Sequence, residues 1–407
     1  MIEVQRPKIL IVGGFTFSRG EAGSNTVIGY GKALERAGFR VEYLGDHGGS
    51  APIREDFRQF TCHCPPEGRV LRGWKAAIVN LSASENRLLR WLSQVPAQEF
   101  RGVAAYPGGD LTAAALARLH RLCLDRGWKL AVIVGEWQGF WQFGGARLHQ
   151  RVLALVNSEI ERRVVNKKIK NIIAISRFLE SYYKSSRCNA ILVPPIVDCS
   201  APKWDCRPKT STDKRGLKLL FSGGWWRDRL DLIAKSVSEL RDEGHDVVLE
   251  FLGSGPEDIG KDPQLRKLVT NAVNGGFRFH GKVPVERVLP ITASADFGVL
   301  LRDRAKWAEA CFPSKLVEFQ ALGVPMLCNL TSNLGEVLKD GQNALIVPEV
   351  SVSAFVKTVK RALALSPAER DHMTQCSLQC AARNFDYRVY SDTLGHFFTN
   401  PNLNSGV

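Results

Sequence analysis

The chain has 407 residues, of which 44% are hydrophobic and 24% charged, and its formal net charge is +14. This composition is typical of a globular protein, and a chain of this length usually divides into two domains of about 200 residues. No apolar run approaches the roughly 20 residues of a membrane-spanning helix. The N-terminus carries acidic and basic residues before a short strand and has no long apolar signal core, so we expect a cytoplasmic protein.

The positive charge is concentrated in the first half. Residues 1–200 contain 28 Lys and Arg against 17 Asp and Glu, whereas residues 201–407 contain 27 against 24. Such a surface attracts an anionic partner, either a membrane face, a phosphate-linked acceptor or nucleic acid. Segment 84–95 mixes leucines and a tryptophan with arginines, which suits an interfacial helix or a core-packing helix with solvated arginines. We find no module typical of nucleic-acid binding, so nucleic acid is not an expected partner.

Strand-like and helical patterns alternate along the whole chain, which predicts an α/β fold with parallel sheets. In the first half we expect strands at 8–12, 40–44, 76–79, 102–105, 129–134, 171–174 and 191–193. A second alternation has strands at 218–221, 247–252, 277–280, 296–300, 325–328 and 344–347. The polar segment 199–216 is the predicted linker between two Rossmann-like domains, at 1–198 and 217–383. Helices follow from 351 to 398, and only residues 400–407 are expected to be disordered.

Ligands of parallel sheets bind beyond the carboxyl ends of the strands, so the loops there are the candidate sites. Gly13 and Gly14 follow the first strand, and Ser24 or Asn25 is predicted to cap the helix that begins after Gly23. We expect this loop to lie beside a ligand; a plain glycine-rich turn is the alternative.

The fifth expected strand, 129–134, is followed by Glu136 and Trp137. Glu136 is a candidate to orient or deprotonate an acceptor hydroxyl. Trp137, together with Phe140 and Trp141, is a candidate to stack on a sugar ring or a lipid, the alternative being structural burial. Asp110 is a weaker candidate base and a better helix cap.

The loop after strand 218–221 offers Gly223 and Gly224, which leave room for a diphosphate. Arg227 or Arg229 would neutralise such a group bidentately. The alternative is a solvated arginine paired with Asp228 or Asp231.

The segment CFPSKLVEFQALGVPMLC at 311–328 is typical of a phosphate-binding helix start. Pro313 suits the first turn, Ser314 is predicted to cap the free amides, and Lys315 places a cation beside them. Glu318 follows one turn later on an apolar helix and needs a partner. A sugar nucleotide, with phosphates and hydroxyls, would satisfy these groups; an ordinary α/β crossover is the alternative.

No metal site is expected. The chain has no Asp-x-Asp pair, and Cys62, His63 and Cys64 lack a second ligand pair at zinc spacing. The ten cysteines are expected to be reduced thiols.

Segments 173–198, 219–233 and 295–347 resemble GT-B glycosyltransferases, in particular family 4-like (group 1) enzymes with an FPSK variant of the nucleotide-binding helix. The resemblance implies two Rossmann-like domains facing across a cleft and a last helix, 384–400, crossing back to the first domain. It also implies a hexosyltransferase-type enzyme that retains anomeric configuration, uses a UDP- or GDP-linked sugar and needs no metal cofactor.

The family's functional positions carry over as follows. The diphosphate would meet Lys315 and Arg227, with Arg229 as second choice. The nucleoside would lie near Gly253, Gly281, Lys282 and Val283, and the amides at Gly335 and Glu336 would face the diphosphate or donor sugar. Many members carry two glutamates seven residues apart, and the first would fall on Ala310 here, with Glu309 one residue off; a shift of one residue rotates a helical side chain by about 100°.

These expectations add up to a glycosyltransferase of cell-surface polysaccharide or glycolipid synthesis. Its acceptor would be lipid-linked or a saccharide, and its basic first domain would contact the inner face of an anionic membrane. The alternatives are a nucleotide-sugar epimerase or hydrolase on the same fold, or a non-catalytic basic protein that docks to membranes.

Overall fold

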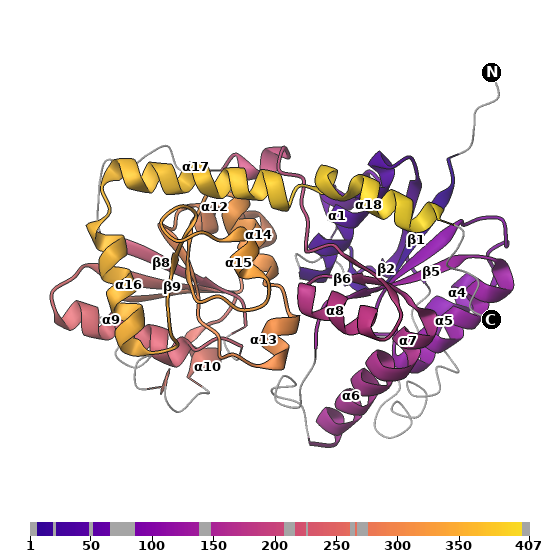
Figure 1. The fold of residues 1–407 in the computed structure, drawn as a ribbon, viewed down its shortest axis with the longest axis horizontal. Coiled ribbons are helices and arrows are strands. Elements are labelled where there is room, and N and C mark those ends of the chain that lie inside the picture. Colours follow the sequence, from indigo (N-terminus) through magenta and orange to yellow (C-terminus); the bar gives the residue numbers. More distant parts are fainter. Residues whose placement is uncertain are drawn as a thin grey trace. The chain divides into compact units, whose positions relative to one another are not determined.

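The computed structural model describes residues 6–18, 22–48, 52–65, 86–137, 148–206, 216–224, 227–260, 265–266 and 276–400. The chain forms two compact units (Figure 1). Unit 1 consists of Met1–Asp198 and Tyr387–Val407, and unit 2 of Cys199–Asp386.

Unit 1 contains, within the described residues, a seven-stranded parallel sheet in the order β3-β2-β1-β4-β5-β6-β7. The strands are β1 (Lys8–Thr16), β2 (Arg40–Asp46), β3 (Thr61–His63), β4 (Gly102–Tyr106), β5 (Lys129–Val134), β6 (Asn171–Ala174) and β7 (Asn189–Leu192). The α/β prediction is confirmed, but β1 runs four residues further than expected and the short edge strand β3 was not predicted. The expected strand 76–79 lies outside the described residues.

The helices of unit 1 follow the strands in the crossover pattern. They are α1 (Ala22–Arg36), α2 (Glu55–Arg58), α4 (Arg87–Ser93), α5 (Ala113–Arg126), α6 (Leu148–Ile160), the π-helical turn η2 (Glu161–Val165), α7 (Asn166–Ile169), α8 (Arg177–Ser185) and α18 (Tyr387–Thr399). In β5 all six side chains are buried, as expected for a central parallel strand covered on both faces. The interfacial reading of segment 84–95 is not supported, because Leu88 and Leu92 of α4 are buried.

The last helix, α18, packs on α1 in unit 1 and not on the helices that precede it in sequence. A Cβ at Gly395 would lie 2.9 Å from the Cβ of Ala37, so glycine permits a close approach of the two helices. Leu394 and Phe398 enter the core of the unit. The ammonium of Lys129, on β5, donates to the carbonyl oxygen of Asn400 at 3.1 Å. The chain therefore returns to unit 1 at its end.

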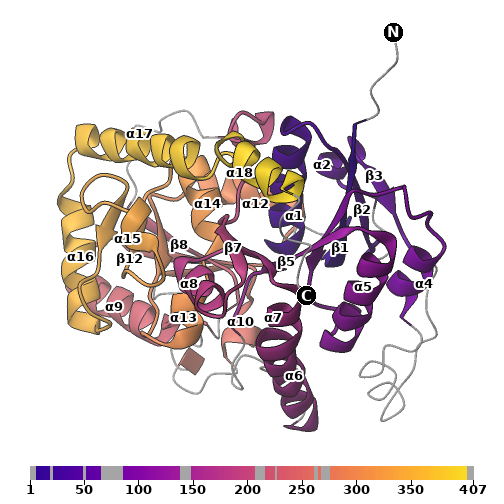
Figure 2. The same ribbon diagram turned by 45° about the vertical axis from the view of Figure 1, so that its right-hand side comes forward.

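Unit 2 has a six-stranded parallel sheet in the order β10-β9-β8-β11-β12-β13 among the described residues. Its strands are β8 (Leu217–Ser222), β9 (Val247–Leu252), β10 (Phe277–Gly281), β11 (Phe297–Leu300), β12 (Met326–Cys328) and β13 (Ala344–Ile346). Its helices are η3 (Pro202–Trp204), α9 (Leu230–Asp242), α10 (Pro256–Ile259), α12 (Val285–Ala293), α13 (Lys306–Ala310), α14 (Ser314–Ala321), α15 (Leu334–Val337), α16 (Val352–Ala364) and α17 (Pro367–Asn384). In Figures 1 and 2, α9 and α16 lie side by side against this sheet.

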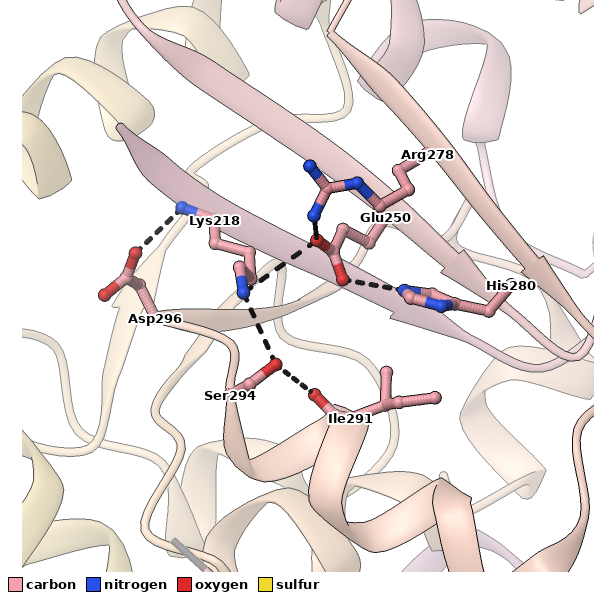
Figure 3. A network of polar contacts seen from close by, with 7 residues as sticks. All are labelled: Lys218, Glu250, Arg278, His280, Ile291, Ser294 and Asp296. Carbon is pink, nitrogen blue, oxygen red and sulfur yellow. Dashed lines mark hydrogen bonds and ion pairs between the residues drawn. The ribbon is translucent and has the colours of Figure 1, made fainter. Parts of the chain in front are cut away.

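A buried glutamate ties together three strands of the unit 2 sheet (Figure 3). Glu250 on β9 is 2% exposed and accepts from Arg278 Nη1 and from the His280 ring, each at 2.8 Å. The ammonium of Lys218, on β8, lies 3.9 Å from the same carboxylate. Two cations and a histidine thus compensate one buried charge and link β8 to the edge strand β10.

Unit 1 repeats this network in the same register. Glu42 on β2 lies 3.1 Å from Lys8 on β1 and 2.8 Å from His63 on the edge strand β3. In both sheets the glutamate pairs with one residue on each neighbouring strand. The lysine lies two residues before the paired residue on its strand, and the histidine lies two residues after the paired residue on its own strand. A Lys–Glu–His diagonal therefore ties the first three strands of each unit.

Candidate active site

The sheet of unit 2 has its topological switch point at β8. The chain passes from β8 to β9 on one side, and later to β11 on the other. In such sheets the loops at the carboxyl ends of these strands separate and leave a ligand crevice. The predicted donor residues lie on the loops after β8, β9, β10 and β12, and at the start of α14, which follows β11. The topology therefore brings all of them to one edge of the sheet.

The loop after β8 is fastened to the end of β11. The backbone N–H of Arg229 donates to the carbonyl of Leu301 at 2.7 Å. Nε of Arg302 donates to Oδ1 of Asp228 at 2.6 Å, and both of these side chains are less than a tenth exposed. A buried, charge-assisted pair of this kind has a well-defined geometry. The loop that carries Arg227 is consequently held at a fixed place beside β11.

Arg302 lies directly after Leu301 at this same edge, and the sequence analysis did not single it out. Its backbone N–H donates to Oδ1 of Asn329 at 2.9 Å, and Nδ2 of Asn329 donates back to its carbonyl at 2.8 Å. Its guanidinium lies 5.6 Å from the ring centre of Trp307. Nη1 is buried and has no hydrogen-bond partner among the described residues. The only sequence signal is an arginine directly after an apolar strand, which is also typical of a solvated loop start.

The charge of Arg302 is maintained by its neighbours. Burial lowers the pKa of this guanidinium, but the attraction of Asp228 and Cys311 and the hydrogen bond to Asp228 outweigh burial and raise the pKa above its ordinary value. The positive charge of Arg227 lowers the pKa of Arg302, because the two positive charges lie near each other. Two guanidinium groups therefore contribute to the positive potential at this edge.

Arg229 is occupied by carboxylates. Its Nε and Nη2 contact the two oxygens of Asp231 at 2.9 and 2.8 Å, and Nη1 contacts Asp303 at 3.0 Å. The hydrogen bonds to Asp231 raise the pKa of Arg229 above its ordinary value. The structure thus has the pairing with Asp231 that was the alternative reading, and Arg229 would reach a diphosphate only by giving up these pairs. Half-buried Arg227 lies on the same loop.

Three glycines stand at the ends of neighbouring strands. Gly223 follows β8, Gly253 follows β9 and Gly281 ends β10. Their φ angles are 140°, 95° and 62°. The N–H of Gly223 donates to Leu252 O, and the N–H of Gly253 donates to Gly281 O. Because positive φ is favourable only for glycine, these turns need glycine. Gly224 follows Gly223, and Lys282 and Val283 follow Gly281. The predicted donor-binding residues therefore lie at one edge of the sheet.

The helix α14 begins one residue earlier than the capping prediction requires. Pro313 is its N-cap, and Ser314 is its first helical residue, with no side-chain hydrogen bond capping the helix. The prediction that Ser314 caps the free amides is therefore wrong; proline fixes the N-cap backbone instead. Lys315 Nζ lies 2.8 Å from Oε2 of Glu318, which is buried. Lys315 is therefore the partner that this buried acid was predicted to need.

Glu309 faces the loop after β12. Its Oε2 accepts the backbone N–H of Ser332 at 3.0 Å, and Ser332 has a φ of 55°, unusual for a residue with a side chain. The neighbouring Ala310 is fully buried. Glu309, one residue away from the family position, therefore accepts a hydrogen bond from this loop. Gly335 and Glu336 are both exposed and lie on the short helix that follows the loop.

The glycines after β1 have a structural reason. A Cβ at Gly13 would lie 1.9 Å from the carbonyl oxygen of Tyr106, and one at Gly14 would lie 2.4 Å from the carbonyl carbon of Gly108. The backbone from Tyr106 to Gly108, at the end of β4, therefore occupies the space that a side chain at either glycine would need. Gly13 and Gly14 also lie within β1 and not in the loop after it.

Ser24 does not cap the following helix. α1 begins at Ala22, so Ser24 is already helical, and its hydroxyl donates to the carbonyl oxygen of Thr16 at 2.8 Å. Gly23 lies against the ring of Tyr106, where a Cβ would meet the ring at 3.0 Å. Both residues hold α1 against the ends of β1 and β4.

Trp137 is part of an aromatic and cationic cluster after β5. The guanidinium of Arg162, on η2, lies 3.7 Å from its ring centre, and the rings of Phe178 and Tyr182 pack edge-on against it. These contacts support the structural alternative for Trp137. Glu136 is exposed at the carboxyl end of β5. Phe140 and Trp141 lie outside the described residues.

Asp110, the weaker candidate base, forms an ion pair with Arg87. The cap of α5 is Thr112, whose hydroxyl accepts the N–H of Ala115, so the prediction that Asp110 is a cap is wrong.

In the described part of the chain no three His, Cys, Asp or Glu side chains form a cluster able to hold a metal ion. Within the same residues no helix has both the length and the hydropathy to cross a bilayer.

Comparisons with known proteins agree with this architecture. Residues 216–364 match the family described as "Glycosyl transferases group 1". An uncharacterized glycosyltransferase of Methanocaldococcus jannaschii is 22% identical over 196 residues, and the match spans about half of each protein, 46% of this chain and 48% of the relative.

Solved structures resemble the whole chain. Sucrose-phosphate synthase from Thermosynechococcus elongatus has a TM-score of 0.69 at 14% identity, covering 97% of this chain and 98% of its own. Anabaena HepE in complex with UDP and glucose has a TM-score of 0.65 at 12% identity, and the match covers 96% of this chain and 99% of HepE. WaaG, a glycosyltransferase involved in lipopolysaccharide biosynthesis, has 0.62 at 14%, covering 96% and 100%. The chain thus has the GT-B fold, and residues 216–364, which lie in unit 2, match the model of the group 1 glycosyl transferases.

Proposed function

We propose that this protein is a glycosyltransferase that moves a hexosyl group from a nucleotide sugar to a hydroxyl of an acceptor. The observation that carries the proposal is the Lys315–Glu318 pair at the start of α14, on the same sheet edge as the loop that Arg302 and Asp228 hold. A lysine ammonium has three donors, and the contact with Glu318 uses one of them. The other two suit the oxygens of a departing diphosphate.

In this proposal positive groups stabilise the leaving group without a metal cofactor. Arg227 and Lys315 neutralise the diphosphate as the glycosidic bond to it breaks, assisted by the amides of Ser314 and Gly335. Glu318 accepts hydrogen bonds from donor hydroxyls, and Glu136 orients the acceptor hydroxyl. Arg229 keeps its loop in place through Asp231.

The base of the donor would lie along the glycine edge at Gly253 and Gly281, near Lys282 and Val283. We propose a UDP- or GDP-linked donor. The HepE structures hold UDP, glucose and UDP-glucose, which supports the uridine form. Retention of anomeric configuration, a lipid-linked or saccharide acceptor and a role in surface polysaccharide or glycolipid synthesis complete the proposal.

A panel of nucleoside diphosphates and nucleotide sugars in a thermal-shift assay tests the donor site. A ligand at one hundred times its Kd stabilises the folded protein by about 2.7 kcal/mol, which is a shift of several degrees. We expect the shift with the wild type and with the control Arg304→Ala, an exposed arginine two residues after Arg302. Lys315→Ala and Glu318→Ala should abolish it, and equal shifts in all four proteins would refute the assigned site.

Transfer assays with the best binder then test the reaction. A glycosyltransferase releases nucleoside diphosphate much faster when an acceptor is present, and the sugar appears on the acceptor. An epimerase or hydrolase converts the donor without an acceptor, and a non-catalytic protein converts nothing. Either of these results would overturn the proposed activity even if the donor binds.

A further inference from the structure

The helix α6 presents an apolar face that no described part of unit 1 covers. Five large aliphatic side chains are 43–68% exposed and recur every fourth residue: Leu148, Val152, Val156 and Ile160 on α6, and Val164 on η2. Each step of four residues turns a side chain by about 40° around an α-helix, so Leu148, Val152, Val156 and Ile160 lie within an arc of about 120°. α6 has no buried residue at all, although an ordinary crossover helix buries its apolar face against the sheet.

The first part of α6 extends past the edge of the unit 1 sheet. The helical segments α6, η2 and α7 have 13, 5 and 4 residues, a length of about 33 Å, whereas the six residues of β5 cover about 20 Å. Oδ1 of Asn157 accepts the N–H of Ala113, the first residue of α5, at 3.0 Å. Residues 148–156 therefore lie beyond the start of α5, and Figures 1 and 2 show α6 projecting away from the sheet.

This projection is on the carboxyl side of the sheet. The chain leaves β5 at Val134 and reaches the start of α6 at Leu148, while α7 ends where β6 begins. In a parallel sheet the helix that follows a strand starts at that strand's carboxyl end. The exposed face thus begins on the edge that also carries Glu136.

Charge indicates what covers this face. α6 and η2 contain three Arg, of which Arg162 is buried, against two Glu, and the lysines at 167, 168 and 170 that follow raise the net charge of residues 148–170 to +4, within a half of the chain that is itself strongly basic. Arg163 stays 67% exposed while paired with Glu159, and Lys168 is exposed as well. Two copies of such a face would repel each other, whereas an anionic bilayer supplies both apolar tails and negative head groups.

We propose that α6 and η2 form an interfacial helix that docks unit 1 onto an anionic phospholipid surface. The aliphatic face enters the head-group region, and the basic side chains remain at the level of the phosphates. The proposal names the membrane-contacting segment for the function proposed above, yet vesicle binding needs neither donor nor catalysis. It replaces α4, whose Leu88 and Leu92 are buried, as the membrane-facing helix.

Vesicle flotation tests the proposal. The full chain is mixed with vesicles of phosphatidylcholine alone or with about one third phosphatidylglycerol. The test variant is Leu148→Ser/Val152→Ser/Val156→Ser, and the control is Val389→Ser, a 50% exposed valine on α18. We expect binding of the wild type and the control to anionic vesicles, and at least a tenfold weaker partition coefficient for the triple variant.

A charge variant and two further measurements make the outcome decisive. Arg151→Gln/Lys168→Gln should weaken binding to anionic vesicles about fivefold for each charge removed and leave binding to neutral vesicles unchanged. The triple variant should keep its circular dichroism and the thermal shift with nucleoside diphosphate, which separates this proposal from the donor site. Equal vesicle binding by the wild type and the triple variant overturns the proposal. A wild-type dimer that becomes a monomer in the triple variant also overturns it, because a second copy then covers the face.

Discussion

The ammonium of Lys315 lies 2.8 Å from Oε2 of Glu318, one turn further along α14, and the glutamate is buried. The pair therefore combines a cation that is about one third exposed with an anion that is nearly inaccessible to water. The cation lowers the cost of the buried carboxylate, and the carboxylate restrains the cation at the helix start. Changes at either residue should affect the other.

Lys315→Met and Glu318→Gln should each lower the unfolding free energy by about 1–3 kcal/mol, because each removes one partner of a charged hydrogen bond. The double variant should lose less than the sum, and the difference is the coupling energy. Urea unfolding of the four proteins measures it. Additive losses within about 0.3 kcal/mol would show that the two side chains do not interact in solution.

Arg302→Ala should reduce both stability and transfer. Removing one partner of a buried pair costs about 3–5 kcal/mol and releases the loop that carries Arg227. We expect a higher KM for the donor, a lower kcat, and partial rescue of both by millimolar guanidinium, which can replace the missing group next to Asp228. Arg304→Ala serves as the control and should behave like the wild type. An Arg302→Ala variant with unchanged KM and kcat would show that the pair does not position the loop.

Glu309 distinguishes a loop anchor from a donor ligand. If its function is to accept the Ser332 N–H, Glu309→Gln keeps an acceptor and should have a donor KM close to that of the wild type. Glu309→Ala removes the acceptor and should raise this KM several-fold. Steady-state kinetics of both variants checks the prediction. Equal impairment of Gln and Ala would indicate instead that the negative charge contacts the donor.

Most of the fold could be predicted from the sequence because buried parallel strands form short aliphatic runs between helical patterns. The edge strand β3 could not, since Thr61, Cys62 and His63 have no such run. They pair with Glu42, Tyr43 and Leu44 of β2, and the His63 ring contacts the carboxylate of Glu42, 21 residues earlier. The same Lys–Glu–His diagonal recurs in unit 2, yet one residue per strand leaves no repeat visible in the sequence.

The candidate site could be predicted only where one segment contains several of its residues. Segment 311–328 gave Lys315 and Glu318 together because they are three residues apart on one helix. Arg302 was missed because its partner Asp228 is 74 residues away. Gly13 and Gly14 were predicted to allow a close approach, but a sequence does not reveal that the backbone at the end of a neighbouring strand is one of the approaching groups.

Glu42 should make the protein sensitive to acid. Burial raises the pKa of this carboxyl, but the hydrogen bonds from His63 and Lys8 outweigh burial and hold it below its ordinary value. A carboxyl with a depressed folded pKa contributes stability that is present above its unfolded pKa, near 4.5, and is lost as the pH falls through the folded pKa. Glu42→Gln should therefore reduce stability at pH 7 and flatten the decline below pH 4.5. Urea unfolding at several pH values measures both effects, and a decline as steep as in the wild type would contradict the assignment.

Glu161 should have the opposite effect. Burial raises the pKa of its carboxyl to about 7, although Asn166 and Arg162 act against the shift. Between pH 4.5 and 7 the folded protein then binds more protons at this group than the unfolded chain, so its contribution to stability falls as the pH rises. The loss is at most about 3 kcal/mol, and it should be complete slightly above pH 7.

Glu161→Gln should abolish this loss, so that the variant gains stability over the wild type as the pH rises from 5 to 8. Glu55→Gln, a change at an exposed carboxylate of α2, is the control and should follow the wild type. Unfolding free energies of the three proteins at pH 5, 6, 7 and 8 test the prediction. Parallel curves for Glu161→Gln and the wild type would mean that the carboxyl is already ionised at pH 5, because water or Arg162 compensates its charge on the π-helical turn better than burial opposes it.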